Sequence, residues 1–197
     1  VGLTELIARQ LGVAQVWLVH RLDKVTSGLL LLALNAESAA ALSRLFAEHR
    51  IEKTYLALSG QKPKKKQGLI IGDMRKVRNG AWKLCQSREN PAITRFQSVS
   101  CEANLRLFVL QPKTGKTHQL RVAMKSLGSP ILGDVLYGKN ASVFDRTYLH
   151  AARLQFEFNG ETFDVFAAPQ EGAWWRKASV LAKMAEKPFL GNEQISV

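Results

Sequence analysis

The residues best suited to chemistry stand near the start of the chain, where Asp23 lies between Arg21 and Lys24 just before an apolar run. This run, residues 29–34, is too short to cross a membrane and predicts a buried strand. We therefore expect Asp23 in a polar turn at the edge of a core, where positive charge favours its ionised form. An ionised, positioned carboxylate can act as a nucleophile or a base. Alternatively, Asp23 only stabilises a turn by pairing with Arg21.

A second polar group is expected on a helix over residues 117–127, which Gly128 ends. His118 and Arg121 are three residues apart and project together near the start of this helix, where backbone N–H groups attract anions. Arg121 can then reach either the Asp23 carboxylate or a phosphate; otherwise it is a surface arginine. The preceding G-K-T is no phosphate loop, because position 110 is Leu where that motif requires glycine.

The elements that must position these residues are of mixed type. Residues 51–59 predict a strand with Leu56 and Leu58 on one face and Lys53 and Tyr55 on the other. Further helices are expected over residues 4–11, 36–50 and 171–187, the second capped by Asn35, and a further strand over 105–111. Asn159-Gly160 predicts a two-residue turn between hairpin strands at 152–158 and 163–167, with one buried face. The final ten residues are expected to be loose.

Composition limits the partners of this chain. Its 197 residues, 46% of them hydrophobic, suffice for one domain. The formal net charge of +12 favours a polyanion, with nucleic acid ahead of an anionic membrane, because no apolar run is long enough to span a bilayer. Cys85 and Cys101 lack the spacing of a zinc site or a disulfide framework, which fits a reducing cytoplasm.

Five segments in a fixed order resemble the motifs of the RluA-type pseudouridine synthases. They are H-R-L-D-K-V-T-S-G-L-L-L at 20–31, K-T-Y-L-A at 53–57, G-K-T-H-Q-L-R-V at 115–122, G-D-V-L-Y-G at 133–138 and L-H-A at 149–151. That family isomerises uridine to pseudouridine in RNA, with the aspartate of the first motif as its catalytic residue. The resemblance implies an α+β fold, a mainly antiparallel sheet flanked by helices, in a single catalytic domain over residues 1–197.

The resemblance also implies roles for individual residues. Asp23 would attack C1′ of the uridine or remove its C2′ proton, and the sequence leaves both routes open. Tyr55, otherwise a core tyrosine, would pack against the flipped base and could assist proton removal at C5. Arg121 would pair with Asp23, and Arg21 would fill the space that the base leaves. His20 is expected to shape the turn.

RNA is the expected partner, as structured ribosomal or transfer RNA. A basic stretch next to the expected cleft is the first candidate for phosphate contacts, although such runs are usually solvated faces. The predicted RNA-binding residues are Arg21, Lys62, Lys64, Lys65, Lys66, Lys116 and His118. Trp82, in the same region, stays unassigned. Isomerisation consumes nothing, so no cofactor or metal is expected; we also expect a monomer and no membrane contact.

Some departures from the family and two alternatives remain. Ala123 stands where members commonly have histidine, and Gly128-Ser129-Pro130 replaces G-H-P. The K-P-x-G segment that usually precedes the aspartate motif is absent, so we expect that a segment is missing from the start. A non-catalytic RNA-binding module would not need Asp23, Tyr55 and Arg121 together. A nucleoside hydrolase would release free uracil.

Overall fold

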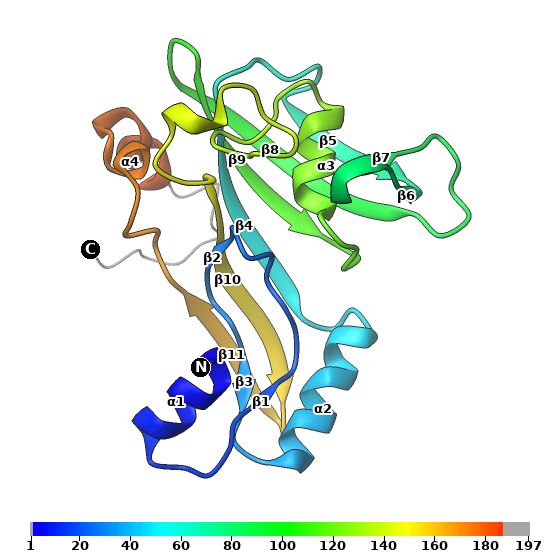
Figure 1. The fold of residues 1–197 in the computed structure, drawn as a ribbon, viewed down its shortest axis with the longest axis vertical. Helices are drawn as coiled ribbons and strands as arrows, with labels where there is room; N and C mark the ends of the chain where they lie inside the picture. The colour runs from blue at the N-terminus through cyan, green and yellow to red at the C-terminus, as the bar shows by residue number, and fades with distance from the viewer. Residues whose placement is uncertain (1, 187–197) are drawn as a thin grey trace.

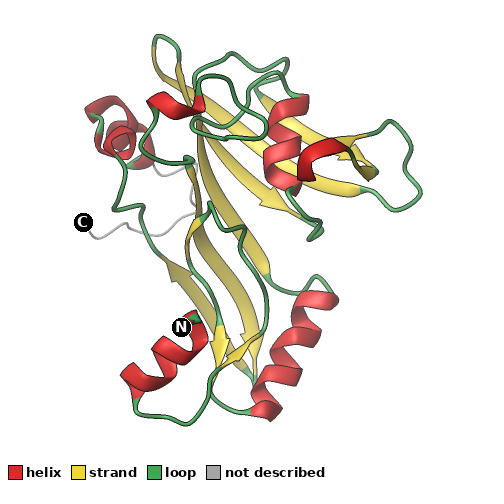
Figure 2. Ribbon diagram, viewed as in Figure 1, coloured by secondary structure: helices red, strands yellow, loops and turns green. Residues whose placement is uncertain are grey.

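A twisted, seven-stranded sheet forms the centre of the molecule, in a computed structural model that describes residues 2–186. Its main path runs β11-β10-β4-β9-β8-β5, every pair antiparallel, and β2 adds a short parallel pair to β10. The strands are β2 (Ser27–Gly28), β4 (Glu52–Ser59), β5 (Gln67–Gly72), β8 (Ala92–Glu102), β9 (Leu105–Pro112), β10 (Leu149–Phe158) and β11 (Glu161–Phe166). The predicted mainly antiparallel α+β architecture is confirmed (Figure 2).

Four α-helices lie around this sheet (Figure 1). They are α1 (Leu3–Leu11), α2 (Ala36–Ala47), α3 (Gln119–Ser126) and α4 (Ala178–Met184). Single turns of 3₁₀-helix occur at Arg78–Gly80, Ala141–Val143 and Ala173–Arg176. Two small antiparallel ribbons pair β1 (Trp17–Leu18) with β3 (Leu32–Ala33) and β6 (Met74–Lys76) with β7 (Trp82–Leu84). Figure 1 shows α1 and α2 at one end of the long axis and α3 and α4 towards the other.

Two hydrophobic clusters hold these elements together. The larger contains Phe108 and Leu110 of β9 and Met124 of α3, each fully buried. The smaller packs Leu42 and Leu45 of α2 against residues of β10 such as Phe156. Each such side chain contributes about 1.5–3 kcal/mol on burial, and the two clusters attach α3 and α2 to the sheet.

Several local predictions are confirmed. Asn35 caps α2, because its Oδ1 accepts the Ser38 N–H at 2.8 Å. Strand β4 covers residues 52–59 with Leu56 and Leu58 buried. Asn159 and Gly160 have φ values of 52° and 76°, as a two-residue turn between twisted strands requires.

Cys85 and Cys101 are both free thiols. In the described part of the chain, no helix has the length and apolar character needed to cross a bilayer.

The apolar run at 29–34 is not the buried strand that its composition predicts. Only Leu32–Ala33 is in a strand, and Leu34 is 61% exposed. The backbone N–H of Leu29 donates to Ala151 O, and that of Leu31 donates to the His20 side chain. These two N–H groups therefore attach the segment that follows Asp23 to the rest of the fold, and only Leu32–Ala33 pairs as a strand.

Two predicted helices were placed incorrectly. Helix α3 starts at Gln119, because His118 adopts a left-handed conformation with φ 56°. The expected helix at 171–187 is a 3₁₀ turn followed by α4, separated by extended Lys177, and the turn places Trp175 in the core at 1% exposure. The hairpin also differs, since β10 is buried on both faces over its first six residues and β11 is mostly exposed. Residues 188–197 lie outside the described part.

Candidate active site

Asp23 lies in a loop, and the residues that follow this loop, Ser27–Gly28, attach it to β10. Ser27 and Gly28 pair with His150 and Ala151, and Gly28 has φ 114°. A Cβ at this glycine would lie 2.1 Å from Ala151 O, so the close approach requires glycine. The T-S-G part of the motif thus fixes where the loop leaves the sheet.

His150 strengthens this attachment. Its Nε2 donates to Ala167 O at 2.8 Å, and its Nδ1 accepts the Ser27 hydroxyl at 2.9 Å. Burial lowers the pKa of His150, which keeps the ring neutral and suited to one donor and one acceptor bond. The L-H-A segment therefore holds the end of the Asp23 loop in place through His150. The neutral His150 ring has a structural role and adds no positive charge to the site.

His20 is also structural, in agreement with the prediction that it shapes the turn. Its Nε2 accepts the Leu31 N–H at 2.8 Å, and its ring stacks on Phe46 with centroids 4.3 Å apart. Burial, assisted by the nearby charge of Lys53, lowers the pKa of His20 to about 4. A neutral ring can accept this backbone hydrogen bond, whereas the protonated ring could not.

Arg121 and Asp134 form a buried, two-pronged ion pair behind Asp23. The Nε and Nη2 atoms of Arg121 donate to the two Asp134 oxygens at 2.8 and 2.9 Å. Asp134 is fully buried and also accepts the backbone N–H groups of Leu136 and Tyr137. Because both charges are removed from water, each depends on the other for compensation.

The third guanidinium nitrogen of Arg121 faces the proposed catalytic carboxylate. Arg121 Nη1 lies 3.5 Å from Asp23 Oδ2, and the Asp23 side chain keeps 28% of its surface exposed. Burial disfavours the charged form of Arg121. The carboxylate of Asp134 and, to a smaller extent, that of Asp23 outweigh this effect and raise the pKa of the guanidinium above its usual value. The ion pair of Asp23 is with Arg121, so the alternative in which Asp23 pairs with Arg21 is wrong.

Tyr137 joins the start of α3 to the same network. Its hydroxyl accepts the Trp82 N–H at 2.8 Å and lies 2.9 Å from His118 Nδ1, and its ring lies 5.2 Å from the Arg121 guanidinium carbon. The prediction that His118 and Arg121 project together is confirmed, since both contact Tyr137. Trp82, unassigned from sequence, contributes its backbone here.

Tyr55 projects from the face of β4 opposite Leu56 and Leu58, as its spacing predicts, and lines the same cavity as Asp23. Burial, and then the charge of Asp23, raises the pKa of Tyr55 to about 12. The phenol is therefore protonated at neutral pH. It can donate a hydrogen bond to a substrate, but ionising it to act as a base would be costly.

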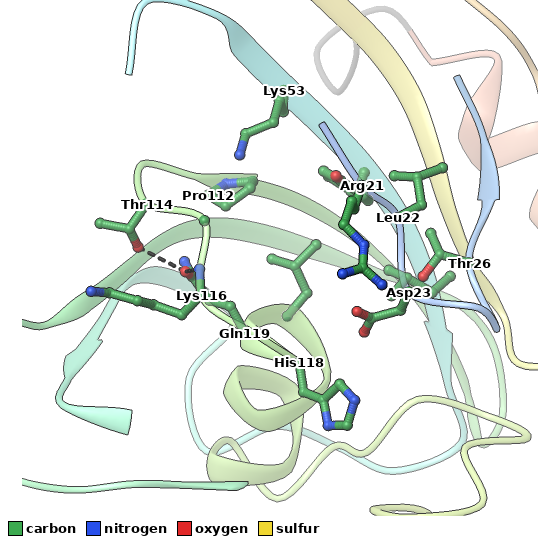
Figure 3. Close-up of a pocket in the computed structure, with 14 residues that line it drawn as sticks. Arg21, Leu22, Asp23, Thr26, Lys53, Pro112, Thr114, Lys116, His118 and Gln119 are labelled. Atoms are coloured by element: carbon green, nitrogen blue, oxygen red, sulfur yellow. Dashed lines mark hydrogen bonds between the residues drawn. The ribbon is translucent and has the colours of Figure 1, made fainter. Parts of the chain in front are cut away.

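The cavity in front of Asp23 has a volume of about 110 Å³ (Figure 3). Figure 3 shows Arg21, Asp23 and Thr26 on one side, Thr114 and Lys116 on the other, and His118 below Asp23. Asp23 is the only carboxylate among its lining residues, which are Arg21, Leu22, Asp23, Thr26, Lys53, Tyr55, Pro112, Thr114, Gly115, Lys116, His118, Gln119, Leu120 and Leu149. No cluster of three metal-ligating side chains occurs between residues 2 and 186.

The predicted RNA-binding residues fall into two separate groups. Arg21, Lys116 and His118 line the cavity, and Lys116 Nζ donates to Asn90 Oδ1 at 2.8 Å. The lysine cluster, Lys62, Lys64, Lys65 and Lys66, is exposed and lies elsewhere. Lys64 N–H donates to Leu127 O at the far end of α3, about 12 Å along that helix from Gln119. None of these four lysines is among the residues that line the cavity, and their contact with RNA stays a prediction.

Sequence reasoning assigned no role to three residues that the structure brings to the site. Asp134 and Tyr137 belong to the G-D-V-L-Y-G segment, where glycine is needed because Gly133 has φ 75° and its Cβ would meet Arg146 O at 1.9 Å. Lys53 was considered only as a neighbour of Tyr55. An aspartate three residues before a tyrosine, in a segment bounded by two glycines, was the available signal for Asp134.

Comparisons with known proteins agree with this geometry. The family model described as RNA pseudouridylate synthase matches residues 3–126. A Haemophilus influenzae protein named "Uncharacterized RNA pseudouridine synthase" is 70% identical over 194 residues, 97% of this chain and 87% of that protein. "Ribosomal large subunit pseudouridine synthase C" of Rickettsia bellii is 44% identical over 127 residues, 62% of this chain. The matched region spans only 42% of that relative's length.

Solved structures show the same fold. Human RNA Pseudouridylate Synthase Domain Containing 1 superposes with a TM-score of 0.68 at 30% identity, over 79% of this chain and 69% of that one. Human RNA Pseudouridylate Synthase Domain Containing 4 gives 0.70 at 24% identity, over 92% and 81%, and supports the fold alone. With a family match over more than half of its residues, this chain belongs to the RNA pseudouridylate synthases, isomerases that convert uridine in RNA to pseudouridine.

Proposed function

We propose that this chain isomerises uridine in large-subunit ribosomal RNA, with Asp23 as the catalytic residue. The observation that carries the proposal is the position of Asp23, which faces the cavity beside Tyr55 and 3.5 Å from buried Arg121. The rRNA substrate is suggested by relatives of this chain from Rickettsia bellii and Zymomonas mobilis, which are named ribosomal large subunit pseudouridine synthases C and D.

The reaction needs an ionised carboxylate and no added reagent. The N1–C1′ bond of the uridine breaks, the uracil turns, and a C1′–C5 bond forms. The C5 proton then leaves and N1 gains one, so the atoms balance. Asp23 either attacks C1′ or takes the C2′ proton first, and both routes begin with the carboxylate ionised. Arg121 Nη1, 3.5 Å from Asp23 Oδ2, supplies the positive charge that pairs with this carboxylate.

The remaining residues of the cavity bind and orient the nucleotide. Tyr55 packs its ring against the base and presents a protonated hydroxyl that can donate a hydrogen bond. Because the hydroxyl stays protonated, we assign Tyr55 this binding role and not the removal of the C5 proton expected from the sequence. Arg21 is exposed at the rim and fills the space left by the flipped base. Lys116 and His118 also line the cavity and face the RNA there. The monomeric state, the cytoplasmic location and the single-domain span stay predictions.

The proposal predicts the loss of a pseudouridine from large-subunit rRNA in a strain that lacks the gene. Pseudouridines can be mapped by carbodiimide labelling followed by reverse transcription. We expect at least one position to lose its signal and to regain it with the wild-type gene but not with Asp23→Asn. An unchanged rRNA map together with a missing position in transfer RNA would overturn the substrate assignment and leave the reaction intact.

Substitution of the lysine cluster tests whether the bound RNA reaches the end of α3 that is remote from the cavity. If Lys62, Lys64, Lys65 and Lys66 contact phosphates, replacing all four with Gln should reduce the slope of log affinity against log salt by up to about 3. RNA-binding titrations over a range of potassium chloride concentrations measure this slope. A cluster remote from the RNA would leave the slope nearly unchanged, and the phosphate contacts would then be confined to the cavity rim.

A further inference from the structure

A second cavity, of about 180 Å³, adjoins the one in front of Asp23. The two share Lys53 and Pro112, so Lys53 stands on the wall between them. Phe46, Ile51 and Pro112 give the second cavity apolar walls, and Gln111 adds an amide. Exposed His49, Glu52 and Lys113 form its rim. Because the two cavities adjoin, a group bound in the second lies next to whatever occupies the first.

Lys53 carries a charge that the protein itself leaves uncompensated. Within residues 2–186, no carboxylate lies within 4 Å of its ammonium and no hydrogen-bond acceptor is in reach. Burial lowers the pKa of Lys53, which shows that the surroundings disfavour the bare cation. A half-buried cation without a partner is destabilising, and an arriving anion would remove that cost.

Space for such an anion exists beside the ammonium. The Cβ position of exposed Gly115 lies 3.7 Å from Lys53 Nζ, so any other residue there would place a side chain against the charge. The loop that contains Gly115 also lines the first cavity. Figure 3 shows the Lys53 side chain extending towards this loop and Pro112.

We propose that Lys53 binds the phosphate linking the target uridine to its neighbour in the RNA, and that the second cavity holds that neighbouring nucleotide. This inference rests on the proposed function, which places the target uridine in the first cavity. Lys53 and Tyr55 are two residues apart on one face of β4, about 7 Å along the strand. A base packed on Tyr55 therefore has its linking phosphate within reach of a lysine side chain.

The test combines a change in the protein with a change in one phosphate. The substrate is an rRNA fragment containing the mapped uridine, made with a neutral methylphosphonate on its 5′ side, on its 3′ side, or on neither. With wild-type protein, we expect one of the two substitutions to raise KM by about tenfold, because a charge-assisted hydrogen bond is lost. Lys53→Gln should show the same increase with the unmodified fragment and no further increase with that methylphosphonate.

Matched variants separate this contact from general charge and from folding. Lys53→Arg retains the cation and should keep most of the affinity, whereas Lys139→Gln removes an exposed charge elsewhere and should leave the methylphosphonate effect at its wild-type size. The slope of log affinity against log salt should fall by about 0.7 in Lys53→Gln. Additive effects of Lys53→Gln and both methylphosphonates would overturn the proposal.

The two proposals fail in different ways. If wild-type protein does not modify the unsubstituted fragment, the rRNA assignment fails before Lys53 is tested. If it turns the fragment over and both methylphosphonates behave like the normal phosphate, only the Lys53 site is wrong. An abasic nucleotide on the sensitive side should also raise KM in wild type, because the second cavity would lose its occupant; an unchanged KM would remove that cavity from the proposal.

Discussion

Asp23→Asn is expected to reduce turnover by at least about 10³-fold while RNA affinity stays within a few-fold of wild type. The amide keeps the shape of the carboxylate but can neither attack C1′ nor accept the C2′ proton. Tritium release from RNA labelled at C5 of uridine measures the rate, and filter binding measures affinity. The fold should survive, because Arg121 keeps its two hydrogen bonds to Asp134 when the charge on Asp23 is removed.

Glu161→Gln is the matched control, since it makes the same chemical change at an exposed residue of β11. It should leave rate and affinity unchanged. Chromatography of the reaction products should detect no free uracil with wild-type protein, because the base is rejoined to C1′; release of uracil would indicate hydrolysis instead. Appreciable tritium release by Asp23→Asn would sink the assignment of Asp23 as the catalytic residue.

The second large effect is expected from Asp134→Asn, which removes the main counter-charge of buried Arg121. Breaking a buried ion pair on one side costs about 3–5 kcal/mol of unfolding free energy. Arg121 is only 4% exposed, and its remaining partner, Asp23, is 3.5 Å away and partly solvated. Urea denaturation should show the destabilisation, and turnover should fall because the freed guanidinium no longer holds its place behind Asp23.

A double variant separates stability from chemistry at this pair. Arg121→Met with Asp134→Leu replaces both charges with apolar side chains, a change that is often neutral or stabilising in a buried pair. We expect stability to return towards the wild-type value while turnover stays low, because Asp23 has lost its cation. If the double variant regained turnover along with stability, Arg121 would be a structural residue with no electrostatic role at Asp23.

The sequence by itself determined the features that depend only on residues close to one another in the chain. The Asn35 cap, the Asn159-Gly160 turn and the face of β4 that carries Tyr55 were all predicted correctly. Each follows from side-chain periodicity or from the backbone preferences of one or two residues. The order of five short motifs also identified the family and pointed to Asp23, and four of these five segments contribute residues that line the cavity.

Only the tertiary structure decided how the buried charges are compensated. The resemblance predicts that Arg121 pairs with Asp23, but not that Arg121 has a closer, buried partner in Asp134. Sequence reasoning placed the lysine cluster beside the cleft, whereas the Lys64 N–H bonds to Leu127 O, at the end of α3 that is remote from His118. The same reasoning took residues 29–34 for a buried strand, because their composition does not reveal that His20 and Ala151 accept their N–H groups. Partners of buried charges and backbone groups are chosen by packing across the fold, and local sequence contains no record of that choice.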